Sequence, residues 1–117
     1  MSDIRVQKPW GFYEMLLQDN RYKVKRLVIT PGKRTSRQRH LHRSEVWTVV
    51  QGLIDDDGKQ YGEGETATIQ AGEWHEIYNP GKIAAIVIEV QYGSYCEEDD
   101  IERKSEKQPD RQCVEIR

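Results

Sequence analysis

Two short stretches of the chain carry side chains that bind transition metals. The first holds Gln38, His40, His42 and Glu45, and the second, about thirty residues later, holds His75. Imidazole nitrogens and carboxylate oxygens are ligands for divalent metals, and residues spaced i, i+2 on a strand point to one face. Either stretch alone is ordinary on a polar surface. Their occurrence in this order predicts one metal site assembled from two halves.

Length and composition restrict what else the protein does. The chain has 117 residues, enough for one domain with one core. Its 20 acidic and 18 basic residues nearly balance, so charge gives no reason to expect a nucleic-acid or membrane partner. The N-terminus has no hydrophobic signal region, and we expect a cytoplasmic protein. Cys96 and Cys113 lack C-x-x-C spacing, and we expect two free thiols.

The elements that must position the metal-binding side chains are predicted to be β-strands. β-branched and aromatic residues concentrate in short segments that end at Gly or Pro. The expected strands are 22–30, 46–50, 66–69, 76–78 and 83–92, with a hairpin at Asp55-Asp56-Asp57-Gly58 within 53–61. The run 83–92 is the longest apolar one and is predicted to be buried on both faces. Regular short strands predict an all-β sandwich or barrel.

The chain divides into one domain and a short tail. Residues 1–105 are predicted to form the barrel with an N-terminal arm, because no repeat or linker interrupts them. A helical turn is expected around 99–107. Residues 106–117 are highly charged and are predicted to be a mobile tail.

Ordered motifs along most of the chain resemble a known family. The second conserved pattern of the cupin superfamily is matched in spacing by Gly64, Gly72, His75 and Asn79. Gln70 stands where proline is usual. Over about residues 5–105, further motifs resemble the C-terminal domain of type II mannose-6-phosphate isomerases. These motifs are Lys8-Pro9-Trp10-Gly11-x-Tyr13-Glu14, Tyr22-Lys23-Val24-Lys25-Arg26-Leu27, Pro31-Gly32, Gln38-x-His40-x-His42-Arg43-x-Glu45-x-Trp47, Asn79-Pro80-Gly81 and Ile88-Glu89-Val90-Gln91-x-Gly93.

The resemblance implies a fold, a cofactor and a reaction. The fold is the double-stranded β-helix, the single-domain jelly-roll barrel of the cupins. The cofactor is a divalent metal ion, for which we favour zinc over manganese, iron or nickel. The reaction is aldose–ketose isomerisation of a phosphorylated sugar, with mannose 6-phosphate and fructose 6-phosphate as the leading pair. In the family this domain often follows a guanylyltransferase domain, which the chain lacks, so we expect no nucleotidyl transfer.

The family pattern also identifies metal ligands by register. In that pattern two ligands spaced i, i+2 precede a Glu, and a Gly lies seven residues after the Glu. Glu45 and Gly52 have this spacing. Counting back gives Gln38 and His40 as the spaced pair, and His75 supplies the fourth ligand. The alternative pair, His40 and His42, stays open because imidazole binds transition metals better than an amide does.

Isomerisation also needs a base and a cation for the phosphate. His42 is free in the preferred register and is our first candidate for the base, ahead of Glu45. Arg43 and Lys25 are the candidates for binding the phosphate, and Lys23 shares the strand face of Lys25.

Other interpretations remain open. Arg37 and Arg39 replace residues that are apolar in relatives, and Val46 stands where relatives commonly have His. These changes favour a non-catalytic cupin that binds a sugar or nucleotide sugar. Another metal-cupin chemistry, such as a dioxygenase reaction, a cupin without metal, and a plain basic surface turn are further alternatives. We expect a homodimer, because pairing hides an exposed sheet edge.

Overall fold

The protein is described by a computed structural model that covers residues 5–94, 100–104 and 113–114. Its strands are β1 (Arg5–Lys8), β2 (Gly11–Gln18), β3 (Tyr22–Ile29), β4 (Arg37–Arg39), β5 (Arg43–Gln51), β6 (Ile54–Asp56), β7 (Lys59–Tyr61), β8 (Thr66–Ile69), β9 (Ala85–Gly93), β10 (Glu102–Lys104) and β11 (Cys113–Val114). Among the described residues there is no helix long and apolar enough to cross a membrane.

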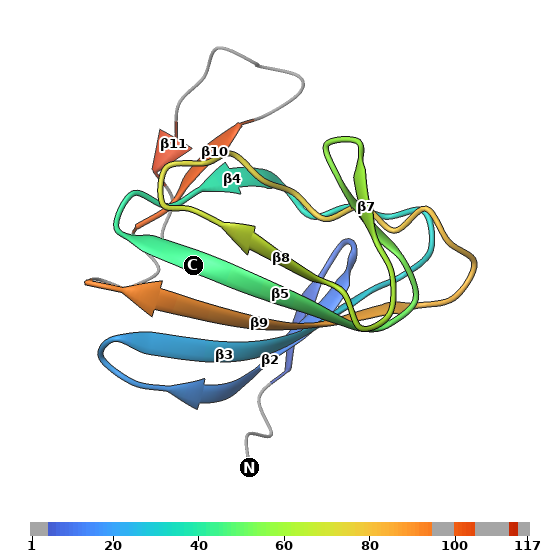
Figure 1. Cartoon of the computed structure of the whole chain (residues 1–117), viewed down its shortest axis with the longest axis horizontal. Helices are drawn as coiled ribbons and strands as arrows, with labels where there is room; N and C mark the ends of the chain where they lie inside the picture. Colours follow the sequence, from blue (N-terminus) through green and yellow to red (C-terminus); the bar gives the residue numbers. More distant parts are fainter. Residues whose placement is uncertain (1–4, 95–99, 105–112, 115–117) are drawn as a thin grey trace.

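Two β-layers enclose the core. One layer is a six-stranded sheet in the order β1-β2-β3-β9-β5-β8 (Figure 1). The other contains the three-stranded sheet β11-β10-β4 and the β6–β7 hairpin, which lie above the large sheet in Figure 1. Isolated bridges join segment 75–79 to this second layer, by pairing Gln38 with His75 and Tyr78 with both Arg34 and Asp55. The predicted all-β, single-domain barrel is confirmed.

Alternation along the three central strands divides the barrel interior into two halves. We call the first the apolar half, and its inward residues on β3, β5 and β9 are Leu27, Ile29, Val49, Ala85 and Val87. We call the second the polar half, and its inward residues on the same strands are Lys23, Lys25, Arg43, Glu45, Glu89 and Gln91. Both sets are buried, so the polar half places charge inside the barrel.

Most predicted strands are confirmed, and the hairpin turn is confirmed in detail. Asp57 and Gly58 both have positive φ, at 56° and 95°, as a two-residue hairpin turn requires. The N-terminal segment, which was predicted to be an arm, is part of the large sheet, because the β1–β2 hairpin pairs with β3. The predicted strand 76–78 is wrong, since this segment makes only isolated bridges.

The prediction for the end of the chain differs most from the structure. Glu102–Lys104 is strand β10, so the expected helical turn around 99–107 is wrong there, because pairing with β4 prevails over local preference. Cys113–Val114 pairs with β10, although residues 106–117 were expected to be a mobile tail. Residues 106–112 and 115–117 lie outside the described residues, as do Cys96 and the side chain of Cys113. Strand β9 is fully buried on its inner face only, because its outward residues are partly exposed.

Candidate metal centre

Three potential metal ligands from separate segments meet in the polar half. His40 follows β4, Glu45 lies on β5, and His75 belongs to the segment that bridges to β4. All three side chains are buried, and their ligand atoms lie within 4.8 Å of one another. Glu45 is central, with Oε2 2.8 Å from Nε2 of His40 and Oε1 3.5 Å from Nε2 of His75. The arrangement offers two imidazole nitrogens and a carboxylate to one cation.

Backbone carbonyls orient both imidazoles. Nδ1 of His40 lies 2.7 Å from the backbone oxygen of Asp100, and Nδ1 of His75 lies 3.2 Å from that of Glu73. A carbonyl oxygen only accepts hydrogen bonds, so each Nδ1 carries the proton and donates it. The Nε2 atoms that face Glu45 are therefore the ones available to a metal, as in proteins whose ligating histidines donate their other nitrogen to the backbone.

Electrostatics keep the central carboxylate ionised. Burial opposes the charge on Glu45, but the charges of His75 and His40, with hydrogen bonds from His40 and Trp47, outweigh burial and hold the pKa of Glu45 well below its ordinary value. The indole Nε1 of Trp47 donates to Oε1 of Glu45 at 2.9 Å and fixes the carboxylate in place. A buried, ionised carboxylate between two imidazoles fits a divalent cation.

The fourth predicted ligand, Gln38, lies beside the other three. Its backbone exchanges two hydrogen bonds of 2.9 Å with that of His75. Its side-chain Nε2 donates to the backbone oxygen and to Oγ of Ser36, at 3.3 and 3.2 Å. The amide nitrogen is thus engaged on the side of Ser36, and the amide oxygen is the atom that would bind a cation.

The candidate ligands open onto one cavity of about 420 Å³, including the space at its mouth. Its lining comprises Trp10, Tyr13, Lys25, Leu27, Thr35, Gln38, His40, Glu45, Trp47, His75, Ile77, Glu89 and Gln91. The mixture of aromatic walls with a few polar groups is typical of small-molecule sites. Nζ of Lys25 lies 4.6 Å above the ring of Tyr13, so this cation is held against the cavity wall.

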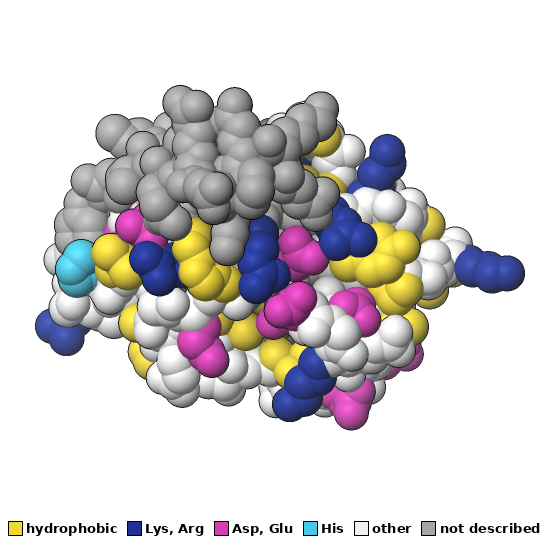
Figure 2. Space-filling view, turned by 90° about the horizontal axis from the view of Figure 1, so that it is seen from above, with side chains coloured by type: hydrophobic (Ala, Val, Ile, Leu, Met, Phe, Trp, Pro, Cys, Tyr) yellow, Lys and Arg dark blue, Asp and Glu magenta, His cyan; other side chains and the backbone are white. Residues whose placement is uncertain are grey.

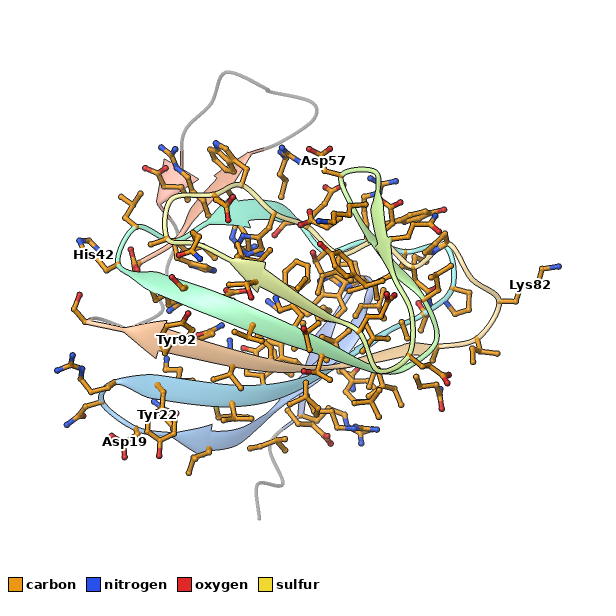
Figure 3. The ribbon with its side chains drawn as sticks, in the orientation of Figure 1. Asp19, Tyr22, His42, Asp57, Lys82 and Tyr92 are labelled. Atoms are coloured by element: carbon orange, nitrogen blue, oxygen red, sulfur yellow. The ribbon has the colours of Figure 1, made fainter. Side chains whose placement is uncertain are left out.

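The predicted base, His42, lies outside this cavity. Its side chain is 58% exposed, and Figure 3 shows it pointing away from the barrel interior. Its Nδ1 is 3.0 Å from Oδ1 of Asp100. The structure therefore brings Gln38 and His40 to the cavity and leaves His42 on the surface of the turn between β4 and β5, because residues two apart on β4 share a face while the turn reverses the chain.

The predicted phosphate-binding cations fall into two groups. Lys25 lines the cavity, whereas Lys23 and Arg43 are buried but are not part of its lining. Nη2 of Arg43 lies 3.4 Å from Nε2 of His40, the nitrogen that also faces Glu45. Gly93 of β9 permits this packing, because a Cβ there would lie 2.4 Å from the backbone oxygen of His42. Arg43 is thus buried inside the barrel next to His40 and is not one of the residues that line the cavity.

Two residues that sequence reasoning gave no role also line the cavity. Glu89 and Gln91 are buried on β9, and Nε2 of Gln91 donates to Oε2 of Glu89. Burial raises the pKa of Glu89, and the negative charge of Glu45 raises it further. Oε1 of Gln91 has no hydrogen-bond partner among the described residues. The available signal was an acid and an amide at alternate positions of an otherwise apolar strand.

The arginines near β4 belong to the outer surface. Arg37 pairs with Asp57 at 3.4 Å, Arg34 pairs with Glu76 at 2.8 Å, and Arg39 pairs with Glu102. Figure 2 shows basic and acidic side chains lying next to one another on the face seen from above. None of the three arginines lines the described cavity. The substitutions noted at Arg37 and Arg39 therefore act on the surface and leave the candidate ligands unchanged.

The chain is similar to one known domain family and to proteins named mannose-1-phosphate guanylyltransferase. Residues 2–106 match the family described as mannose-6-phosphate isomerase C-terminal. A mannose-1-phosphate guanylyltransferase from Escherichia coli (strain K12) is 45% identical over 106 residues, which are 87% of this chain and 22% of that protein. The chain thus spans about a fifth of the length of this relative.

Solved structures share the fold at low sequence identity. A Klebsiella pneumoniae protein with a double-stranded β-helix domain has a TM-score of 0.70 and 22% identity, covering 78% of this chain and 79% of that one. An RmlC-like cupin protein from Ralstonia eutropha JMP134 has a TM-score of 0.71 and 14% identity, covering 90% of this chain and 69% of that one. These matches confirm the double-stranded β-helix. With nine-tenths of its length matching the family model, the chain belongs to the mannose-6-phosphate isomerase C-terminal family.

Proposed function

We propose that the protein is a metal-dependent isomerase that interconverts mannose 6-phosphate and fructose 6-phosphate. The observation that carries the proposal is the buried cluster of His40, Glu45 and His75, which lines a cavity with aromatic and polar walls in a chain of this family. A sugar that enters this cavity reaches the cluster directly.

The proposed metal ligands are Gln38, His40, Glu45 and His75, and zinc is the proposed ion. Among the described residues that line the cavity, the charged ones besides histidine are Lys25, Glu45 and Glu89. Glu45 is held ionised between the two imidazoles, and this buried negative charge favours a cation. When bound, a divalent ion supplies a charge that stabilises the negative charge developing on the sugar oxygens as the C2 proton leaves.

Glu89 takes the role of base that sequence analysis assigned to His42. It faces the cavity, and its raised pKa suits a group that both accepts and returns a proton near neutral pH. In this proposal Glu89 removes the proton from C2 of the open-chain aldose and delivers it to C1, while the hydrogen on O2 moves to O1. Aldose and ketose differ only in these two hydrogen positions. Oε1 of Gln91 accepts a sugar hydroxyl, and Lys25 is the cation that faces the substrate.

The direct test is isomerase activity with and without metal. Purified protein is loaded with zinc or treated with a chelator and incubated with mannose 6-phosphate, and fructose 6-phosphate is measured. The proposal predicts product only with metal-loaded protein and loss of product in His75→Ala. Metal-loaded protein that forms no more fructose 6-phosphate than His75→Ala would contradict it.

A second candidate function is non-catalytic binding of an uncharged sugar. It is supported by the small number of cations in the cavity that could bind a phosphate. Lys25 is the single lysine or arginine among the described lining residues, and it pairs with Glu89 on the neighbouring strand. Calorimetric titration distinguishes the two functions. Tighter binding of mannose than of mannose 6-phosphate, without product formation, favours this second function.

Two earlier expectations remain part of the proposal. We propose that the protein acts in the cytoplasm, where sugar phosphates are metabolised, and that it forms a homodimer. Tyr22 and Tyr92 support the second point, since these large exposed side chains are paired on neighbouring strands β3 and β9 (Figure 3). Light scattering tests it, and a monomer at micromolar concentration would contradict it.

A further inference from the structure

One buried carboxylate far along the chain holds the turn that separates two candidate ligands. Asp100 accepts hydrogen bonds from the backbone N–H of Leu41 at 3.0 Å and of His42 at 2.9 Å. Its Oδ1 also accepts from Nδ1 of His42 at 3.0 Å. Its own backbone oxygen accepts from Nδ1 of His40 at 2.7 Å. A single residue therefore binds three successive residues of the link between β4 and β5.

Strand β10, which follows Asp100, contacts Gln38, the candidate ligand on β4. Strand β10 pairs with β4 so that Arg103 lies opposite Gln38. Nη1 of Arg103 donates to Oγ of Ser36 at 3.1 Å, and the same Oγ accepts from Nε2 of Gln38 at 3.2 Å. The described segment 100–104 is thus connected to the side chains of both Gln38 and His40.

This connection controls which nitrogen of His40 faces Glu45. A backbone carbonyl requires a proton on Nδ1, so Nε2 is left without its own hydrogen when the imidazole is neutral. Removing the carboxylate of Asp100 leaves the N–H groups of Leu41 and His42 without their acceptor and releases the turn. The backbone oxygen of residue 100 then loses its fixed position opposite His40.

We infer that Asp100 is a positioning residue for the metal centre, which holds the β4–β5 turn and presents Nε2 of His40 to a cation. The inference rests on the metal site of the proposed function but not on the isomerase reaction. Its measurable consequence is metal affinity, because a site whose ligands are already oriented loses less conformational freedom when the ion binds.

The test compares two carboxylate-to-amide changes on the same segment. Asp100→Asn replaces one acceptor oxygen by a nitrogen that cannot accept from an N–H group, whereas Glu102→Gln alters only the ion pair with Arg39 on the outer surface. Zinc affinity is measured by competition with a chromogenic chelator, and the visible spectrum of the cobalt-loaded protein reports ligand geometry. We expect Asp100→Asn to weaken zinc binding by about ten- to a hundredfold and to change the cobalt spectrum. We expect Glu102→Gln to match the wild type in both.

Further measurements distinguish a failure of this inference from a failure to fold and from a failure of the proposed function. Nitrogen-15 spectra of the wild-type imidazoles without metal should show that Nδ1 of His40 carries a proton, and an Nδ1 without a proton would overturn the inference. Wild-type zinc affinity in a folded Asp100→Asn variant would also overturn it, while leaving the proposed function intact. A wild-type protein that binds no metal would overturn both. Thermal unfolding of the metal-free variants establishes that the compared proteins are folded.

Discussion

The two halves of the barrel interior are built on the same strands and have opposite chemistry. In the apolar half, β3, β5 and β9 point Ile29, Val49 and Val87 into a continuous hydrophobic core. A few residues along the same strands, the inward positions are occupied by groups such as Glu45 and Glu89, which are also buried. Burying apolar surface stabilises the fold, whereas burying charge costs free energy unless a partner compensates it. The comparison indicates that the residues of the apolar half stabilise the fold, whereas the charged residues of the polar half are best explained by binding of a ligand or cation.

The largest effect should come from removing a candidate ligand from the polar half. His75→Ala takes one imidazole from the cluster, so we expect loss of metal and of several kcal/mol of transition-state stabilisation, about a thousandfold in turnover. Metal content and the rate of fructose 6-phosphate formation measure this. His42→Ala is the matched control, because this imidazole is exposed outside the cavity, and it should retain activity within a few-fold. An inactive but metal-replete His42→Ala protein would restore the original assignment of His42 as the base.

Shortening a side chain in the apolar half should lower the stability of the fold and leave metal binding nearly unchanged. Ile29 is completely buried in the core, so Ile29→Ala should lower the free energy of unfolding by about 2–5 kcal/mol. Chemical denaturation of the metal-free protein measures this loss. Zinc affinity of the folded variant should stay within a few-fold of the wild type. A parallel drop in affinity would show that the two halves are not independent.

A smaller, pH-dependent effect should reveal the cost of charge in the polar half. Burial, followed by the charge of Glu45, raises the pKa of Glu89, so the folded chain binds this proton more tightly than the unfolded chain does. The stability from that proton is present at low pH and is lost as the pH rises from the unfolded-state pKa through the raised folded-state pKa. Glu89→Gln cannot ionise and should gain stability relative to the wild type as the pH rises above the unfolded-state pKa of Glu89, while losing turnover. Thermal unfolding without metal measures the gain, and a variant that becomes relatively less stable at pH 8 would contradict it.

The smallest effect should come from charge outside the barrel. Arg37 and Asp57 pair at 3.4 Å on the surface, and Figure 3 shows Asp57 at the tip of the β6–β7 hairpin. Arg37→Ala should change the free energy of unfolding by less than about 1 kcal/mol and leave zinc affinity unaltered. Urea denaturation and zinc competition check both values. A tenfold loss of affinity would mean that Arg37 acts on the polar half after all.

Much of the fold was predictable, because its strands have local signals. β-branched residues in short segments that end at Gly or Pro predicted what became β3 and β8, and the longest apolar run predicted β9. Asp57-Gly58 identified the hairpin. The predicted strand 76–78 was wrong and strand β10 was missed, since the conformation of both segments depends on pairing with residues distant in sequence. Local propensity does not determine such pairing.

In the candidate site, too, the residues that local spacing identifies were predictable, and the features that depend on distant residues were not. The spacing from Glu45 selected Gln38 and His40, which the structure places beside the cavity. The position of His42 was not predictable, because the turn that exposes it is held by Asp100, 58 residues away. Glu89 could have been found, since an acid inside a buried strand is costly without a function. The homodimer and the cytoplasmic location remain predictions.

The central claim is that the polar half of the interior is built to hold one divalent cation. Crystals grown with zinc, with diffraction data collected on both sides of the zinc absorption edge, test it most directly. We predict one anomalous peak per chain, bounded by Nε2 of His40, Nε2 of His75, the carboxylate of Glu45 and the amide oxygen of Gln38. A barrel without a peak at this position, or with zinc held only elsewhere on the chain, would contradict the claim.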